Sequence, residues 1–252
     1  MSPARTEVDL AKLGVIGSAG AMGAALRDVI ELGEHVYAGG ADRGDDVAIL
    51  VREADALIDF SAPQALETNL AAARDAGVPI VVGTTGLADA HHRLIDDAAR
   101  EIPVLQTGNT SLGVTLLAHL VREAAARLGT DWDIEIVEMH HRRKVDAPSG
   151  TALLLGEAAA EGRGIALADN RESGRDGQTG ARAQGAIGFA ALRGGTVAGE
   201  HSVIFAGEQE RVTLAHNAED RTIFARGAVR AAEWLIGREP GRYGMADVLD
   251  LK

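Results

Sequence analysis

The residues best suited to chemistry gather in one segment near the middle of the 252-residue chain. Residues 138–151 read EMHHRRKVDAPSGT and combine two histidines, a lysine and two arginines. Histidine exchanges a proton near neutral pH, and lysine can lose its proton when its surroundings lower its pKa, whereas arginine stays charged. Lys144 is one of only three lysines among 25 basic residues, so it stands where this chain usually has arginine. The segment therefore indicates proton-transfer chemistry.

The same segment is typical of an anion receptor. Ser149 is a favourable N-cap residue, and Gly150 and Thr151 are expected to open the next helix. Backbone N–H groups at a helix start attract carboxylates and phosphates, and the neighbouring basic side chains add positive charge. His140 and His141 end a predicted strand, so their side chains should point to opposite faces. The pattern fits a substrate with two negative charges.

Three other interpretations of this segment are weaker. A solvated basic surface would also read HHRRK, but it would not explain the capped helix beside it. A metal site is not expected, because the chain has no HExxH motif and its other histidine pair, His91 and His92, lies in a predicted surface helix. Ser149 is not expected to be a nucleophile, because APSGT is not the strained GxSxG turn.

A glycine loop near the start of the chain predicts a nucleotide site. Residues 17–23 read GSAGAMG. They follow a predicted strand at 13–16 and open a predicted helix at 20–32. Small residues let backbone N–H groups approach a pyrophosphate at the helix start. Asp42 ends the second predicted strand, 19 residues past the last glycine, where an acid bonds a ribose hydroxyl. Arg43 is either a receptor for a 2′-phosphate or a solvated surface arginine.

Two further loops are expected at the same edge of the sheet. Gly83-Thr84-Thr85-Gly86 and Thr107-Gly108-Asn109-Thr110 each follow a predicted strand. Ligands of open α/β sheets bind at the carboxyl ends of the strands. Both loops are small, polar and rich in backbone donors, as a nucleotide cleft requires.

The elements that must position these residues follow from hydrophobic periodicity. Short β-branched runs alternate with Ala-rich helical stretches over the first 110 residues, which predicts βαβ units and a parallel sheet. The strands are expected at 13–16, 35–38, 56–60, 78–82 and 104–106, with helices at 20–32, 63–76 and 88–100. The middle of the chain predicts an α+β domain with more antiparallel than parallel pairing. Its helices are expected at 112–128 and 151–161 and its strands at 132–139, 187–192, 200–205 and 211–216, with no element in the polar stretch 162–185 and a further helix at 222–236.

Composition excludes several classes of function. A net charge of −12 and 3% aromatic residues disfavour binding to nucleic acids. No apolar run approaches the length of a membrane span, and the first residues lack the apolar stretch of a signal peptide, so a cytoplasmic location is expected. The absence of cysteine excludes thiolate catalysis, Cys-ligated zinc and iron–sulfur clusters.

At ExHHxxKxDAPSGTA, residues 138–152, the chain resembles the 4-hydroxy-tetrahydrodipicolinate reductase (dihydrodipicolinate reductase) family. The similarity extends to the C-terminus, in segments that lie at 17–23, 58–60, 82–86, 188–189, 199–201, 227–230 and 247–250. The family has a Rossmann-like nicotinamide-binding domain completed by the C-terminal helix, here 1–111 with 220–252. Its central domain, here 112–219, binds the substrate and builds a homotetramer on a mixed sheet.

The resemblance also implies a reaction and roles for residues. The family reduces a cyclic unsaturated imino dicarboxylate to tetrahydrodipicolinate with NADH or NADPH, in diaminopimelate and lysine biosynthesis, without a metal. His140 would be the proton donor and acceptor and Lys144 a second proton donor, while His141 and the backbone of Gly150 and Thr151 would hold a substrate carboxylate. The residues that would line the cofactor are Gly17, Ser18, Ala19, Gly20, Ala21, Met22, Asp42, Arg43, Gly83, Thr84, Thr85, Thr107, Gly108, Asn109 and Thr110.

Three departures from the family pattern bear on the cofactor. Ala21 stands where the family often has an arginine near the adenine ribose. Thr110 replaces the usual larger apolar residue beside the nicotinamide, and the segment 43–54 is shorter than in many relatives. The loss of the arginine weakens any grip on a 2′-phosphate, so we expect NADH to be used at least as well as NADPH. Two other functions stay open at this point. They are a dehydrogenase of another small amino or imino acid and a nucleotide sensor without catalysis.

Overall fold

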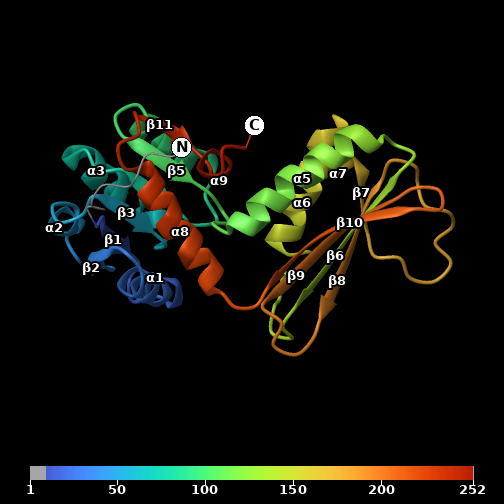
Figure 1. Ribbon diagram of the computed structural model, residues 1–252, viewed down its shortest axis with the longest axis horizontal. Coiled ribbons are helices and arrows are strands. Elements are labelled where there is room, and N and C mark those ends of the chain that lie inside the picture. Colours follow the sequence, from blue (N-terminus) through green and yellow to red (C-terminus); the bar gives the residue numbers. More distant parts are fainter. Residues whose placement is uncertain (1–9, 252) are drawn as a thin grey trace, which may run out of the picture. The chain divides into compact units, whose positions relative to one another are not determined.

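The computed structural model describes residues 10–251, and these form two compact units (Figure 1). The first unit contains the residues up to Ser111 together with Thr222–Asp250, and the second contains Leu112–Arg221. The chain thus leaves the first unit once, builds the second, and returns. The functions assigned to the two units from the sequence stay predictions.

The first unit is built on a six-stranded sheet in which every neighbouring pair is parallel. The strand order is β11-β5-β4-β3-β1-β2. The strands are β1 (Lys12–Ile16), β2 (Val36–Ala41), β3 (Ala56–Asp59), β4 (Ile80–Val82), β5 (Pro103–Gln106) and β11 (Gly241–Tyr243). This confirms the expected Rossmann-like parallel sheet.

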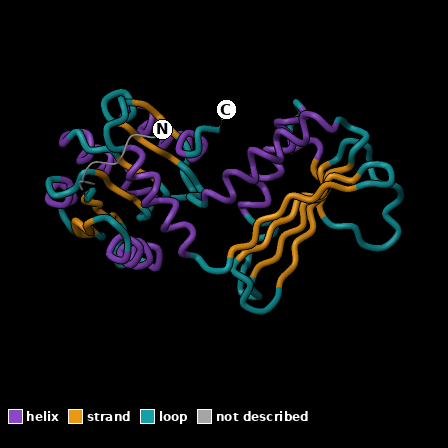
Figure 2. The backbone as a smooth tube through the Cα atoms, in the orientation of Figure 1, coloured by secondary structure: helices purple, strands orange, loops and turns teal. Residues whose placement is uncertain are grey.

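Helices lie on both sides of this sheet, so its central strands have no face exposed to solvent (Figure 2). Every residue of β3 and β4 is buried, which is the pattern of parallel strands that are covered on both sides. The helices are α1 (Ala21–Leu32), α2 (Val47–Val51), η1 (Pro63–Ala65), α3 (Leu66–Ala76), α4 (Asp89–Ala98), α8 (Thr222–Leu235) and α9 (Met245–Val248). α8 packs against α1, β3, β4 and β5, so the end of the chain completes the first unit.

Three short elements of this unit were not predicted. α2 and α9 are too short to show helical periodicity, and β11 has only three residues, GRY. β11 is a strand because its backbone pairs with β5, which a local sequence pattern cannot show.

The second unit is a five-stranded sheet with helices on one face (Figures 1 and 2). The strand order is β10-β9-β6-β8-β7. The strands are β6 (Asp133–His140), β7 (Arg171–Ser173), β8 (Ile187–Arg193), β9 (Gly199–Ala206) and β10 (Arg211–Ala218). The helices are α5 (Leu112–Leu128), α6 (Gly150–Arg163) and α7 (Leu167–Asn170). Alternate residues of β6 are buried, as predicted.

The pairing in this sheet is evenly mixed rather than mainly antiparallel. β6 and β7 each pair with β8 in parallel, whereas β9 pairs with β6 and with β10 in an antiparallel sense. The sequence pattern did not reveal the parallel pairs, because α6 carries the chain across the sheet between β6 and β8. α7 and β7 also lie in the polar stretch where no element was expected. No helix within residues 10–251 combines the length and the apolar character that crossing a membrane requires.

Candidate active site

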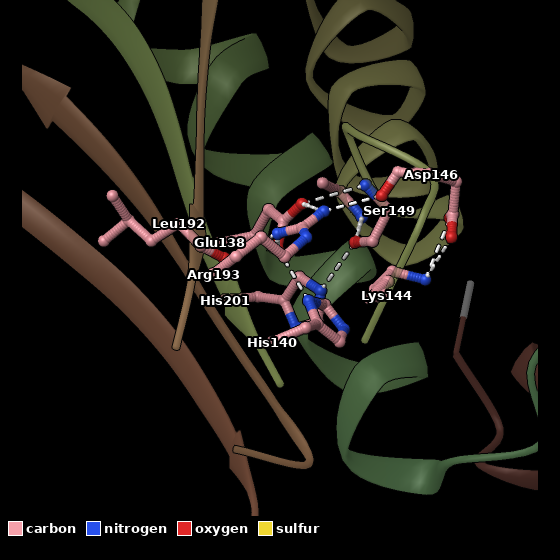
Figure 3. A network of polar contacts seen from close by, with 9 residues as sticks. Glu138, His140, Lys144, Asp146, Ser149, Leu192, Arg193 and His201 are labelled. Carbon is pink, nitrogen blue, oxygen red and sulfur yellow. Dashed lines mark hydrogen bonds and ion pairs between the residues drawn. The ribbon is translucent and has the colours of Figure 1, made fainter. Parts of the chain in front are cut away.

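The carboxylate of Glu138 is the centre of a buried polar network at the carboxyl end of β6 (Figure 3). The Glu138 side chain is 1% exposed. Both terminal nitrogens of Arg193 donate to this carboxylate, Nη1 to Oε2 at 2.8 Å and Nη2 to Oε1 at 2.9 Å. The backbone N–H of Ser149 donates to Oε1 at 3.1 Å, and Nδ1 of His140 lies 2.6 Å from Oε2. Burial alone would raise the pKa of Glu138, but these bonds outweigh it and hold the pKa below its ordinary value.

His140 shares a face of β6 with Glu138 because side chains two residues apart lie on the same side of a strand. An ionised carboxylate only accepts hydrogen bonds, so Nδ1 of His140 must carry a proton. Its other nitrogen, Nε2, makes no hydrogen bond with any residue that the structure describes. The predicted proton donor is therefore a nearly buried imidazole, 9% exposed, with one nitrogen held and the other free to exchange a proton.

His201, from β9, packs edge-on against His140 with ring centroids 5.1 Å apart. Burial, followed by the charge of His140, lowers the pKa of His201 to about 4. His201 is therefore neutral near pH 7 and adds no positive charge beside His140.

Ser149 is the N-cap of α6, as predicted. Its Oγ accepts the N–H of Ala152 at 3.2 Å and lies 3.0 Å from Nε2 of His201. A serine oxygen beside a histidine nitrogen resembles a hydrolytic pair. Here, however, Ser149 is buried and its oxygen accepts a bond from the helix start, so the contact is structural.

Lys144 lies in the loop between β6 and α6, where Asp146 holds it. Its Nζ is 2.9 Å from Oδ1 and 2.8 Å from Oδ2 of Asp146. The hydrogen bond from Lys144 lowers the pKa of Asp146 below its usual value. Arg193 also donates to the backbone oxygen of Asp146 at 2.6 Å. The loop that carries the predicted second proton donor is thus tied to the network around Glu138.

The predicted carboxylate receptor is a helix start with open space beside it. A Cβ added at Gly150 would meet no atom within 4 Å, and α6 runs for 14 residues behind it. Thr151 is half-buried in the first turn. The backbone N–H of His141 donates to Val197 at 2.8 Å, and its Nδ1 is buried without a partner among the described residues. The roles of these three residues stay predictions.

The glycine loop of the first unit has the tight geometry that close backbone approach requires. Gly17 has φ +84°, and a Cβ there would lie 2.7 Å from the oxygen of Phe60. A Cβ at Gly23 would lie 2.3 Å from the oxygen of Gly17. The N-cap of α1 is Gly20, which offers no side chain to the first N–H groups of the helix. These groups, at Ala21, Met22 and Gly23, are suited to a phosphate.

Asp42 lies at the end of β2, as expected, but its carboxylate also holds the glycine loop. Its Oδ2 accepts the hydroxyl of Ser18 at 2.5 Å, and both oxygens lie within 3.1 Å of the N–H of Ala19. Arg43 is exposed and forms no ion pair within the described residues. The Asp42 carboxylate thus fixes the glycine loop through Ser18 and Ala19.

The other two predicted loops are anchored to the sheet and to α8. Thr84 is buried and donates to Asp59 at 3.4 Å, whereas Thr85, which follows it, is exposed. A Cβ at Gly83 would meet the Phe60 ring, so only glycine fits beneath that ring.

The second of these loops is closed by its own side chains. Thr107 Oγ1 donates to the oxygen of Asn109 at 2.8 Å and accepts its N–H at 3.0 Å, and Gly108 lies between them with open space beside it. The hydroxyl of Thr110 donates to the oxygen of Phe224 at 2.7 Å. This bond to α8 is a structural reason for a threonine, and not an apolar residue, at position 110.

Sequence reasoning did not assign roles to Glu138, Arg193, Asp146 or His201. The period of two along β6 was a signal that pairs Glu138 with His140. No comparable local signal exists for Arg193 and His201, which arrive from β8 and β9.

Together, the fold and the two sets of residues define a class. A Rossmann-like nucleotide unit and a mixed-sheet unit with a held histidine beside a helix start are features of nucleotide-dependent oxidoreductases that act on small acids. The family description "Dihydrodipicolinate reductase, N-terminus" matches residues 11–110, and "Dihydrodipicolinate reductase, C-terminus" matches residues 113–249. The chain belongs to the dihydrodipicolinate reductase family.

Individual relatives agree with this membership. The chain is 54% identical over 253 aligned residues to 4-hydroxy-tetrahydrodipicolinate reductase from Zymomonas mobilis, covering 98% of this chain and 100% of that protein. It is 60% identical over 207 residues to the reductase of the same name from Parvibaculum lavamentivorans, covering 82% and 76%. A dipicolinate-bound dihydrodipicolinate reductase from Paenisporosarcina has the same fold, with a TM-score of 0.77, 22% identity and coverage of 94% and 99%. Among residues 10–251, no group of three or more acidic or histidine side chains is arranged to hold a metal ion.

Proposed function

We propose that the chain reduces 4-hydroxy-tetrahydrodipicolinate to tetrahydrodipicolinate with a nicotinamide nucleotide, in diaminopimelate and lysine biosynthesis. The observation that carries this proposal is the His140 imidazole, held by Glu138 on one nitrogen and free on the other, in the same network as the start of α6. A sensor without catalysis would have no physical need for this arrangement.

The first unit has the features that a dinucleotide requires. The first turn of α1, whose N-cap makes no side-chain bond, offers N–H groups to a pyrophosphate, and the Asp42 carboxylate at the end of β2 would bind a ribose hydroxyl. When bound, the nicotinamide supplies a hydride to the conjugated imine of the substrate.

The second unit supplies the proton and the charge that hydride addition requires. The negative charge that the substrate gains must be neutralised. The protonated ring of His140 would give up its proton from Nε2 and become the neutral form that keeps its proton on Nδ1, beside Glu138. Lys144 stabilises the developing charge and can yield a proton itself, which arginine cannot. The first turn of α6, at Gly150 and Thr151, with His141 would hold one substrate carboxylate.

For the cofactor, we propose that NADH is used at least as well as NADPH. A 2′-phosphate on the adenine ribose would bring negative charge to the Asp42 carboxylate, and Ala21 offers no cation to compensate. Arg43, which follows Asp42 and is exposed, is a cation that would favour the phosphate. A higher kcat/KM with NADPH than with NADH would contradict the proposal, and Arg43→Ala should lower the NADPH value more than the NADH value.

We also propose that the enzyme is a cytoplasmic homotetramer that associates through the open face of the second sheet. Helices cover one face of this sheet, and the other presents Val137, Met139, Ile204 and Leu192. Leu192 is 50% exposed, and a group of apolar side chains left uncovered on one face marks an interaction surface.

The test of the reaction is nucleotide oxidation with substrate made in place from pyruvate and aspartate semialdehyde by the preceding synthase. Wild type should turn over, and His140→Asn and Lys144→Ala should each lose roughly 10²–10⁴-fold in kcat/KM, the usual contribution of a general acid. Arg143→Ala is the matched control, because it removes an exposed positive charge from the same loop. Nucleotide binding without turnover by wild type would instead favour a sensor or another imino acid.

A further inference from the structure

We propose that Glu138 and Arg193 are positioning residues that fix the ring tautomer of His140. Nδ1 keeps its proton, so Nε2 is the nitrogen that gains and loses the exchanged proton. The proposal rests on the proposed function for its catalytic consequence, although the tautomer itself is a property of the protein alone. Neither residue would touch the substrate, so their effect passes through His140.

The first argument is the number of donors on Glu138. The carboxylate receives two N–H bonds from Arg193 and one from Ser149, in addition to the bond with Nδ1 of His140. Three fixed donors keep the carboxylate ionised and in one orientation. An ionised, oriented acceptor admits only the Nδ1–H form of the neutral imidazole. Without Glu138 the two tautomers would compete.

The second argument is the reach of Arg193. Its guanidinium donates to Glu138 on β6, to its neighbour Leu192 on β8, and to the oxygen of Asp146 in the loop. Asp146 in turn holds Lys144. Arg193 therefore positions both Glu138, which bonds His140, and Asp146, which bonds Lys144.

The third argument concerns the other charges around His140. His201 contacts the ring but stays neutral, because its pKa is about 4. His201 therefore adds no charge beside the ring. Among the described residues, Glu138 is the acid that bonds Nδ1 of His140. The titratable and charged groups that face His140 or its neighbours are Glu138 on β6, Arg193 on β8, His201 on β9, His216 on β10, and Lys144 and Asp146 in the loop.

The chain contains a matched control for Arg193. Arg182 also bonds carboxylates of β6, at 2.8 Å to Glu135 and 2.9 Å to Asp133, and its side chain is similarly covered, 16% against 21% exposed. It lies at the opposite end of the strand from His140. Arg182→Lys therefore removes an equivalent guanidinium and leaves the contacts among Glu138, Arg193 and His140 intact.

The experiment measures the tautomer and the turnover separately in the full-length protein. Histidine labelled with ¹⁵N in the ring is incorporated, and the His140 signals are identified by their loss in His140→Asn. In the wild type, at a pH where the ¹⁵N signals themselves show a neutral ring, we expect Nδ1–H for His140. In Glu138→Gln, whose amide can accept or donate, we expect a mixture of tautomers and a fall in kcat of roughly tenfold or more, since general acids contribute about 10²–10⁴-fold. Arg193→Lys should shift both quantities in the same direction, and Arg182→Lys neither.

The outcomes separate this proposal from the proposed function. Nε2–H as the main form in the wild type would overturn it, as would an unchanged tautomer in a folded Glu138→Gln protein. If Glu138→Gln does not fold, an unchanged His140 spectrum in Arg193→Lys would overturn it equally. The expected tautomers in a protein that reduces no substrate would uphold the positioning device and reject the proposed reaction.

Discussion

The imidazole of His201 is held in a setting that disfavours its charged form. It is 4% exposed, shares its Nε2 with Ser149, and faces His140 edge-on. In an unfolded chain the same histidine would titrate near its ordinary value, about 6.5. The folded protein therefore resists a proton that the unfolded protein accepts.

The consequence is a loss of stability in mild acid. Because the folded pKa of His201 is about 4, the unfolded state binds more protons between about pH 6.5 and about pH 4, so stability falls as the pH is lowered through this window. The full effect approaches roughly 3 kcal/mol. Urea midpoints measured from neutral to acid pH should show the fall, and His201→Gln, which can still bond Ser149, should flatten it. An equally steep fall in His201→Gln would contradict this assignment. His216 contributes in the same direction, since burial lowers its pKa as well.

Among the elements, the end of β3 depends on the buried carboxylate of Asp59. Asp59 is 0% exposed and accepts from the N–H and hydroxyl of Ser61 at 2.8 and 2.6 Å. Asn69 on α3 donates to its other oxygen at 3.0 Å, and Thr84 donates at 3.4 Å. The loops after β3 and β4 and the helix α3 thus meet at one acceptor.

We expect Asp59→Asn to weaken both the fold and the nucleotide site. The amide nitrogen would face groups that donate, which leaves buried donors unpaired at a cost of about 1–3 kcal/mol. Urea denaturation should report the loss of stability, and nucleotide titration should report weaker binding, because the loop after β4 loses an anchor. Asp55→Asn is the control, since this exposed acid accepts the Lys12 N–H at the other end of β3. Equal effects of the two changes would contradict the special role of Asp59.

The helix α8 approaches the loop after β5 so closely that one position admits only glycine. A Cβ at Gly227 would lie 1.7 Å from the oxygen of Thr110, whose hydroxyl bonds Phe224 on the same helix. In an ordinary helix, glycine to alanine stabilises by about 1 kcal/mol. Here Gly227→Ala should destabilise by about 1–3 kcal/mol, because α8 must move from the loop. The measurement is the urea midpoint of unfolding, which should fall in Gly227→Ala. A midpoint that rises would refute the close packing.

At the scale of the whole molecule, the uncovered sheet face of the second unit predicts self-association. Leu192→Glu places a charge on that face, and we expect it to lower the mass measured by light scattering from that of a tetramer. Leu32→Glu, on the last turn of α1 at 89% exposure, is the matched control and should leave the mass unchanged. A wild-type protein of monomer mass would reject the proposed assembly directly.

The sequence alone determined those structural features that depend on residues close together in the chain. The turn after β1 needs glycine at position 17 for its positive φ, Ser149 caps the helix that follows it, and the alternation along β6 separates a buried face from an open one. Each depends on residues a few positions apart, so composition and spacing suffice to predict it.

Tertiary structure alone decided which distant groups complete the site. Arg193 follows Glu138 by 55 residues and meets it because β8 lies beside β6 in one register, while His201 meets His140 because β9 lies on the other side. A shift of either strand by one residue would turn these side chains to the open face of the sheet. No local pattern encodes that register. It follows from the packing of the sheet against α5 and α6, which also keeps the bonds of Glu138 away from water.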